Sequence, residues 1–511
     1  MVVKITSAAV IGLDAHKVEV EFDTTNSLPG VVIIGLPDIA ISEAKERLRL
    51  AIKNSGYSFP QTKAVINLAP ADLKKEGTAF DLSMAAAILV KIGAIANAPD
   101  KTAFIGELSL DGSLRPVSGV LPVVSALKEL EMSKVIIPKE NLEEASFVEG
   151  IEILGAKNLK EVVAHLNEGI PLYKNEKGLD DLFKFLDNLD KGEEFDTDFK
   201  HIKGQVLAKK ALEIAAAGGH NVLLSGPPGS GKTLLSKAFV SILPPLTKDE
   251  AIELTKIYSV SGLLDSSNPV ISKRPFRSPH HSASAVGIIG GGSSPRPGEI
   301  TLAHRGVLFL DEMAEFPRNV LEVLRQPLED GEVTISRASV SIKYPANFTL
   351  IGAMNPCPCG FLGDSIKPCT CSDFQISRYR SRLSGPLLDR IDLQVEISRL
   401  NEKELLSSPE GESSQDIRKR VIKARKAQSE RYREDNIYTN SELNSKLINK
   451  FCKIDSASKN MLKGAITRFN LSGRAYDRIL KISRTIADLE GKKDISAEHI
   501  AQALQFRGLS L

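Results

Sequence analysis

Cysteine is scarce in this chain, with five among 511 residues. No apolar run reaches membrane-spanning length, and the first residues, MVVKITSAAVIGLDAHKVEVEFD, lack the apolar core and cleavage site of a signal peptide. We therefore expect a cytoplasmic protein with no membrane partner. In that reducing compartment, paired cysteines serve more often as metal ligands or redox groups than as structural disulfides.

A charge imbalance is also absent, because 66 Lys and Arg residues face 64 Asp and Glu residues, for a net charge of +2. This balance excludes a globally basic nucleic-acid binder, so any contact with nucleic acid must use local patches. The composition, 42% apolar and 25% charged, is that of a folded protein. Its length exceeds what one core supports and predicts two to four domains.

The chain divides into blocks of different pattern, and we predict a multidomain α/β fold. The first block alternates short β-type runs with helical patterns, and a charged, glycine-interrupted linker follows it. An α/β pattern then returns, and the last block is helical and rich in charge. The predicted boundaries are a first domain at 1–170, a linker at 171–198, a second α/β domain at 199–395 and a C-terminal helical domain at 396–511.

The strongest motif is NVLLSGPPGSGKT, in which an apolar strand predicted over Val222 to Leu224 enters a glycine loop that a helical run follows. This is the strand–loop–helix context of a P-loop. Its backbone N–H groups point at phosphate oxygens, its lysine reaches the β- and γ-phosphates, and its threonine ligates magnesium. The sequence therefore predicts that ATP and Mg²⁺ bind at Gly226, Pro227, Pro228, Gly229, Ser230, Gly231, Lys232 and Thr233.

The partner motif is GVLFLDEM, four apolar residues that predict a buried strand ending at Asp311 and Glu312. Ligands of open α/β sheets bind at the C-terminal ends of such strands. Asp311 is predicted to hold Mg²⁺, directly or through water. Glu312 is predicted to orient and deprotonate the attacking water, so the motif indicates ATP hydrolysis.

From residue 199 onward the sequence resembles the AAA+ ATPases, especially the group of magnesium-chelatase motors and minichromosome-maintenance helicases. The segment DFKHIKGQ is similar to the one that packs against adenine in that family. The resemblance implies that Asn355, after FTLIGAM, is the polar sensor of the γ-phosphate. It also implies that Arg390, in LLDRIDL, is an arginine finger acting on the neighbouring subunit, and that Arg474, in SGRAYDRIL, is the second sensor, in a helical lid.

Two insertions of the ATPase block carry basic residues. One is SKRPFRSPHHSASAVGIIGGGSSPRPGEITLAH, where His280 and His281 either help to gate the loop or are structural. The other, GEVTISRASVSIKYPANF, is predicted to be a β-hairpin of the kind that touches DNA in related helicases. Phosphate contacts are therefore predicted, against the alternative of ordinary loop charges, at Arg274, Arg277, Arg296, Arg337 and Lys343.

Across its whole length the chain resembles the ComM/YifB family, through RPFRSPHHSASAVGIIGGG, PRPGEITLAHRGVLFLDEMAEF and NPCPCG. The resemblance implies a ring-shaped, ATP-driven motor for branch migration of DNA during recombination or natural transformation. We expect a homo-oligomer, a hexamer, that acts on single-stranded or branched DNA. The alternatives are a chelatase-like or chaperone-like remodeller of a protein, a peptidase, and a DNA-binding regulator.

The first block resembles the proteolytic domain of Lon peptidases, but Ala79 and Leu121 occupy the positions of the catalytic serine and lysine. Carbon side chains neither attack a carbonyl nor accept a proton, so we predict no peptidase activity. A displaced dyad of Ser83 and Lys128 is the alternative. Without peptidase activity, the domain is predicted to be a Lon-like module for ring assembly or for DNA contact, with Lys74 and Lys75 as candidate DNA contacts.

Four of the cysteines crowd into MNPCPCGFLGDSIKPCTC, directly after the predicted sensor strand. Two symmetric Cys-x-Cys pairs favour a tetrahedral thiolate site for Zn²⁺ over a redox pair. Such a closed site is structural and pins the loop beside Asn355. The predicted ligands are Cys357, Cys359, Cys369 and Cys371, whereas Cys452 is predicted to pack in a core.

Overall fold

The structure is a computed structural model, and its chain divides into two compact units. The first comprises Met1–Lys191 and Thr247–Ser272, and the second comprises Gly192–Leu246 and Lys273–Leu511. Most of the predicted linker 171–198 lies outside the described residues. These are 2–175, 197–265, 269–292, 295–336, 341–364, 366–400, 411–435, 437–469 and 471–507.

The first unit is built on a seven-stranded mixed sheet of order β3-β4-β2-β1-β5-β8-β9. β1 pairs antiparallel with β2, and β2 with β4, whereas the remaining neighbours are parallel. The strands are β1 (Val3–Ile11), β2 (Asp14–Thr25), β3 (Gly30–Ile34), β4 (Lys63–Ala69), β5 (Thr102–Phe104), β8 (Lys134–Pro138) and β9 (Glu152–Ala156). The predicted alternation of strands and helices in this block is confirmed.

The helices of the first unit are α1 (Ile39–Asn54), α2 (Asp81–Lys91), α3 (Val120–Glu129), α4 (Leu142–Ala145) and α5 (Leu159–Glu168). Helix α2 is central, because its first nine residues are all buried. A helix that is buried on all sides lacks a polar face and is almost wholly apolar in sequence. The stretch LSMAAAILV has this composition.

A segment from inside the predicted ATPase block belongs to the first unit. It contains α9 (Lys248–Val260), which packs on α3. Gly119 N–H donates to the Ser259 carbonyl at 3.2 Å. Glu144, buried on α4, accepts hydrogen bonds from the Leu121 N–H at 3.0 Å and from the Ser259 hydroxyl. The predicted block 199–395 is therefore not one contiguous structural unit.

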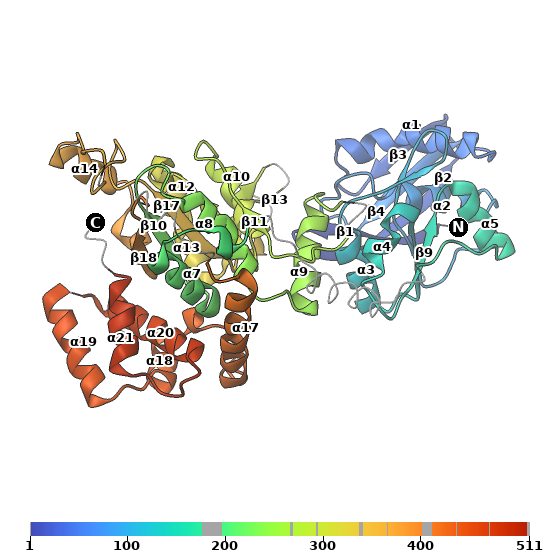
Figure 1. Cartoon of the computed structure of the whole chain (residues 1–511). Helices are drawn as coiled ribbons and strands as arrows, with labels where there is room; N and C mark the ends of the chain where they lie inside the picture. Colours follow the sequence, from blue (N-terminus) through green and yellow to red (C-terminus); the bar gives the residue numbers. More distant parts are fainter. Residues whose placement is uncertain are drawn as a thin grey trace. The chain divides into compact units, whose positions relative to one another are not determined.

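The second unit contains a five-stranded sheet of order β11-β14-β17-β10-β18, in which every neighbouring pair is parallel. Figure 1 labels β10, β11, β17 and β18 of this sheet. Every residue of β10, β14 and β17 is buried, which explains why these strands appear in the sequence as continuous apolar runs. The strands are β10 (Val222–Ser225), β11 (Phe276–Arg277), β14 (Val307–Leu310), β17 (Thr349–Met354) and β18 (Leu393–Glu396).

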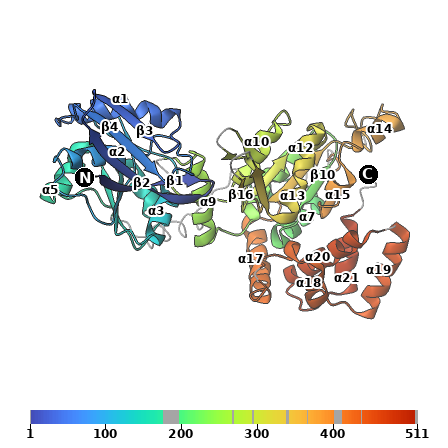
Figure 2. The same cartoon turned by 180° about the vertical axis from the view of Figure 1, so that it is seen from behind.

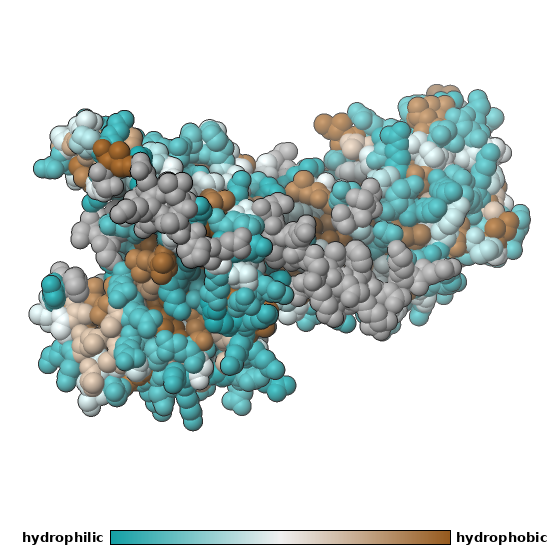
Figure 3. Space-filling view, in the orientation of Figure 1, coloured by the Kyte–Doolittle hydropathy of each residue, from teal (hydrophilic) through white to brown (hydrophobic). Residues whose placement is uncertain are grey.

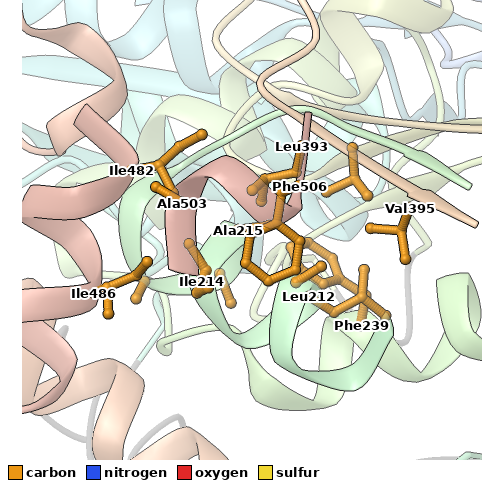
Figure 4. Packing of buried hydrophobic residues seen from close by; sticks show 14 of the residues in the cluster. Leu212, Ile214, Ala215, Phe239, Leu393, Val395, Ile482, Ile486, Ala503 and Phe506 are labelled. Atoms are coloured by element: carbon orange, nitrogen blue, oxygen red, sulfur yellow. The ribbon is translucent and has the colours of Figure 1, made fainter. Parts of the chain in front are cut away.

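The C-terminal region is helical, as predicted, and shares one core with this sheet. Its helices are α17 (Ser414–Arg431), α18 (Ser445–Phe451), α19 (Ser456–Phe469), α20 (Gly473–Leu489) and α21 (Ala497–Gln505). Figure 4 shows Ile482, Ile486 and Phe506 packed with residues of the sheet and of α7 (Val206–Gly218). Cys452 is buried in the same core, which confirms its predicted packing role.

The second predicted insertion forms the β-hairpin that the sequence indicated. β15 (Glu332–Ser336) pairs antiparallel with β16 (Ser341–Pro345) and lies against α13 (Arg325–Asp330) (Figure 2). The turn between the strands, with Arg337, lies outside the described residues. Among the described helices, none combines the length and apolar character that crossing a bilayer requires.

Candidate functional site

The P-loop joins the end of β10 to the start of α8 (Lys232–Ala238), as the sequence predicted. Gly229 and Gly231 have φ angles of +76° and +90°, a region that side chains with a Cβ rarely adopt. An added Cβ at Gly226 would lie 2.2 Å from the Ile397 carbonyl oxygen. These glycines are therefore required by the backbone, and the loop curls around the N-terminus of α8.

Lys232 lies inside this loop. Its ammonium donates hydrogen bonds to the Gly226 carbonyl at 2.6 Å, the Pro227 carbonyl at 2.9 Å and the Asn355 side-chain oxygen at 3.3 Å. Burial lowers the pKa of Lys232 to about 8, against the opposing charges of Asp311 and Glu312. Asn355, the predicted sensor, and the P-loop lysine thus meet at the common edge of β10 and β17.

The two acids lie at the end of the neighbouring β14. Asp311 accepts a hydrogen bond from the Thr233 hydroxyl at 2.8 Å, so the two predicted Mg²⁺ ligands are already adjacent. Glu312 has a φ of +49°, and its N–H donates to the Asp311 carboxylate at 3.0 Å. His281 Nδ1 lies 3.5 Å from the Glu312 carboxylate. This contact was not predicted, because the two residues are thirty-one positions apart in the sequence.

The arrangement fits a nucleoside triphosphate with its Mg²⁺. The Ser230 hydroxyl is buried in the loop and lacks a hydrogen-bond partner among the described residues. A buried orphan hydroxyl is costly, and a phosphate oxygen is an acceptor that the loop is shaped to hold. Hard oxygen ligands such as Thr233 and Asp311 suit Mg²⁺.

Nucleotide binding is expected to take up a proton at alkaline pH. With its pKa near 8, the free Lys232 is mostly neutral at pH 9, and a bound polyphosphate restores its charge. We expect uptake of about 0.9 proton per nucleotide at pH 9 and about 0.1 at pH 7, with affinity falling as pH rises above 8. Calorimetry in buffers of different ionisation enthalpy measures this, and an uptake near zero at pH 9 would contradict it.

The two predicted arginines differ in their surroundings. Arg390 follows α15 (Gly385–Leu388), and only 13% of its side chain is exposed. Its guanidinium pairs with Glu329 and donates to the Arg325 carbonyl at 3.1 Å. Arg474 lies exposed in the first turn of α20.

The predicted DNA contacts fall into two groups, arginines that are paired within the chain and cations that are exposed. Arg274 donates to the Pro244 and Arg305 carbonyls, both at 2.6 Å, and Arg277 forms a two-pronged ion pair with Glu299. Both are therefore engaged within the chain. Arg296 and Lys343 are exposed, although Lys343 pairs with Glu332 at 2.6 Å. Arg337 lies outside the described residues.

In the described part of the first unit, the two residues of the alternative dyad have different surroundings. Ser83 is fully buried and donates to the Phe80 carbonyl at 2.8 Å, whereas Lys128 is exposed at the end of α3. Leu121 is buried among apolar side chains. The prediction of Lys75 as a DNA contact is wrong, because this lysine is fully buried and donates to the Pro70 carbonyl.

The paired cysteines converge on one point. The Cys357, Cys359 and Cys369 sulfurs lie 3.4 to 3.6 Å apart, and all four sulfurs, including Cys371, are within 4.8 Å of one another. Four thiolates at about 2.3 Å from a tetrahedral ion are about 3.8 Å apart, so the cluster can hold a metal. Backbone N–H groups of Phe361 and Thr370 lower the pKa of Cys359 to about 6.

The cysteine loop also touches the P-loop. A Cβ at Gly360 would lie 2.8 Å from the Pro228 ring, which shows how closely the two loops pack. Arg399 bridges them, because it lies 3.4 Å from the Asp364 carboxylate and donates to the Pro228 carbonyl at 3.4 Å. Exposed Phe374 and Ile366 lie near this loop, and Figure 3 shows hydrophobic surface at α14 (Asp373–Arg380).

In this parallel sheet, β17 separates the P-loop strand β10 from the acid-bearing strand β14, and helices follow the sheet in the chain. This arrangement is that of a P-loop protein of the AAA+ type. Models of magnesium chelatase subunit ChlI match residues 20–141 and 198–405, and its C-terminal model matches 411–507. The chain therefore belongs to the magnesium-chelatase-like AAA+ proteins of the ComM/YifB type.

Its similarity to individual relatives extends over the whole chain. Competence protein ComM of Haemophilus influenzae is 43% identical over 512 residues, covering 98% of this chain and 97% of ComM. Protein YifB of Escherichia coli (strain K12) is 42% identical and covers 98% of this chain and 96% of its own. The magnesium-chelatase 67 kDa subunit of Heliobacterium mobile is 28% identical over only 32% of this chain.

Proposed function

We propose that this protein is a ring-forming ATPase that moves along DNA during recombination or natural transformation. The observation that carries the proposal is the convergence of Lys232, Asp311 and Asn355 at one sheet edge in a chain similar over its full length to a competence protein. Bound Mg²⁺ would neutralise developing phosphate charge. Lys232 would hold the γ-phosphate, and Glu312 would take a proton from the attacking water.

The ring is the second part of the proposal. The Arg390 carbonyl is bound by Asn221, which precedes β10, whereas the P-loop of the same chain follows β10. The carboxylate partner of Arg390, Glu329, is itself exposed. A head-to-tail interface, closed into a hexamer, would bring Arg390 to the neighbour's γ-phosphate. Arg474 at the start of α20 would contact the nucleotide of its own subunit, with α17–α21 acting as a lid.

DNA is the proposed substrate of movement, in single-stranded or branched form. Two exposed cations would contact DNA phosphates, Arg296 in the first insertion and Lys343 on β16 of the hairpin. The first unit would serve as a Lon-like module for ring assembly or DNA contact. The second candidate function is a chelatase-like or chaperone-like remodeller of a protein partner, which the chelatase family models favour.

Comparing ATPase rates distinguishes these functions. We expect hydrolysis by the full chain to rise several-fold with single-stranded or branched DNA and to stay at the basal rate with unfolded protein. Both measurements use the Lys232→Ala variant to subtract background. Stimulation by protein alone would contradict the DNA motor and favour the remodeller.

We further propose that the cysteine cluster holds a structural Zn²⁺, because four thiolates at near-tetrahedral spacing suit this ion. Elemental analysis of the purified chain is expected to return about one zinc per chain. A Cys369→Ser, Cys371→Ser double variant should lose it. Less than about 0.2 zinc per chain in reduced, full-length protein would contradict the proposal.

A further inference from the structure

The segment that carries Arg390 is held from one side by a buried arginine of α20. Arg478, which is 6% exposed, donates hydrogen bonds to the Leu388 carbonyl at 3.2 Å and to the Ile391 carbonyl at 3.0 Å. Its other terminal nitrogen donates to the Asp389 carboxylate at 2.9 Å. One planar guanidinium therefore fixes the backbone on both sides of Arg390, a task for which its rigid fork of donors is suited.

From the other side, the residue before the P-loop strand holds Arg390 itself. The Asn221 side-chain amide donates to the Arg390 carbonyl at 3.0 Å, and its oxygen accepts from the Leu350 N–H at 2.8 Å. The Asn221 N–H in turn donates to the Asp392 carboxylate at 3.3 Å. Residues 388–392 are thus bound by Asn221, which precedes β10, and by Arg478 of the C-terminal helices. Among the described carboxylates, the Arg390 guanidinium pairs only with that of Glu329, which is exposed.

Helix α20 carries both Arg478 and Arg474, the predicted second sensor. Arg474 stands one turn before Arg478, and the helix buries a continuous face from Arg478 to Asp488. Such a packed helix moves as a rigid element, so a displacement at its first turn is carried to the guanidinium one turn later.

We propose that Arg478 is a positioning residue for Arg390. Through Arg478, the position of α20 sets the position of Arg390, which the same subunit presents to its neighbour. A nucleotide that Arg474 contacts at the start of α20 would therefore influence the position of Arg390. This inference rests on the proposed function of Arg390 in trans and deepens it. Arg478 touches neither nucleotide. It acts on the neighbour's hydrolysis through the backbone of residues 388–391.

The test uses Arg478→Met in the full-length chain. We expect hydrolysis to fall at least about tenfold, while affinity for a fluorescent ATP analogue changes less than twofold. Lys481→Met is the matched control. It removes another cation of α20, one that is only partly buried, donates to the Ser441 carbonyl and, among the described residues, makes no hydrogen bond to residues 388–391. It should retain more than half of the wild-type rate, and an equal loss in this control would overturn the proposal.

Mixing subunits separates positioning from general damage. Arg478→Met keeps a working P-loop, and Lys232→Ala keeps a working Arg390, so a mixed ring contains interfaces with both. An equimolar mixture is expected to recover roughly one quarter of the wild-type rate, since one pairing in four is productive in a head-to-tail ring. Arg478→Lys, whose single ammonium replaces the fork, should show the same recovery if the methionine variant does not fold.

The mixture of Arg390→Ala with Lys232→Ala tests whether Arg390 acts on the neighbouring subunit, independently of whether Arg478 positions it. If that mixture recovers and the Arg478→Met mixture does not, Arg478 acts only within its own subunit and the inference is overturned, while the proposed ring stands. If neither recovers, the proposed trans site fails and this inference fails with it.

Discussion

Replacing Glu312 with glutamine is expected to abolish ATP hydrolysis while ATP binding persists. The amide keeps the size of the side chain at the end of β14 but cannot accept the proton of the attacking water. General-base catalysis contributes about 10²- to 10⁴-fold, so the rate should fall at least about 100-fold. Single-turnover hydrolysis and equilibrium binding of labelled ATP measure the two effects separately.

The control for this prediction is Lys232→Ala, which removes the ammonium that lies at the Gly226 and Pro227 carbonyls. It should weaken binding as well as hydrolysis, because the proposed site gives this lysine a phosphate contact in the ground state. A Glu312→Gln variant that hydrolyses within threefold of wild type would show that another group activates the water. His281, 3.5 Å from the Glu312 carboxylate, would then be the first residue to replace.

Replacing Arg390 with alanine is expected to lower hydrolysis by about 10³-fold and to leave ATP affinity nearly unchanged. An arginine finger stabilises charge that develops on the transferred phosphoryl group, and such fingers contribute about 10³- to 10⁵-fold. The guanidinium must leave Glu329 to act on a neighbour, so Glu329→Gln should not reproduce the defect. Steady-state rates and analogue binding on both variants measure this.

If Arg390→Ala weakens ATP binding as much as hydrolysis, the arginine acts within its own chain and the trans arrangement is contradicted. Glu329→Gln is the matched control because it removes the same ion pair from the opposite side. An equal loss in both variants would mean that the ion pair holds the local fold and that the guanidinium has no separate catalytic task.

The ATPase sheet could be predicted from sequence because its strands are buried on both faces. β10, β14 and β17 therefore appear as apolar runs in the sequence. β10 is followed by the glycine loop, β14 by Asp311 and Glu312, and β17 by Asn355. The cysteine cluster was predictable because its four cysteines are close in sequence. The P-loop glycines follow directly from the φ angles that the turn requires.

Tertiary contacts were not predictable in the same way. The apolar face of α9 indicates burial but does not name α3 as its partner. Lys75 was expected at the surface beside Lys74, yet it is fully buried, its ammonium donates to the Pro70 carbonyl, and its backbone pairs with Leu36 and Asp38. Arg277 was expected to contact DNA, but it pairs with Glu299, twenty-two residues away, a tertiary contact that local sequence patterns do not reveal.

The stoichiometry of the active species tests the central claim most directly. Sedimentation of the Glu312→Gln variant with ATP and single-stranded DNA, together with wild-type turnover per chain across protein concentrations, measures it. We predict assembly into rings and a turnover that rises steeply as chains associate. A monomer under these conditions, with turnover per chain independent of concentration, would contradict a catalytic site completed by its neighbour.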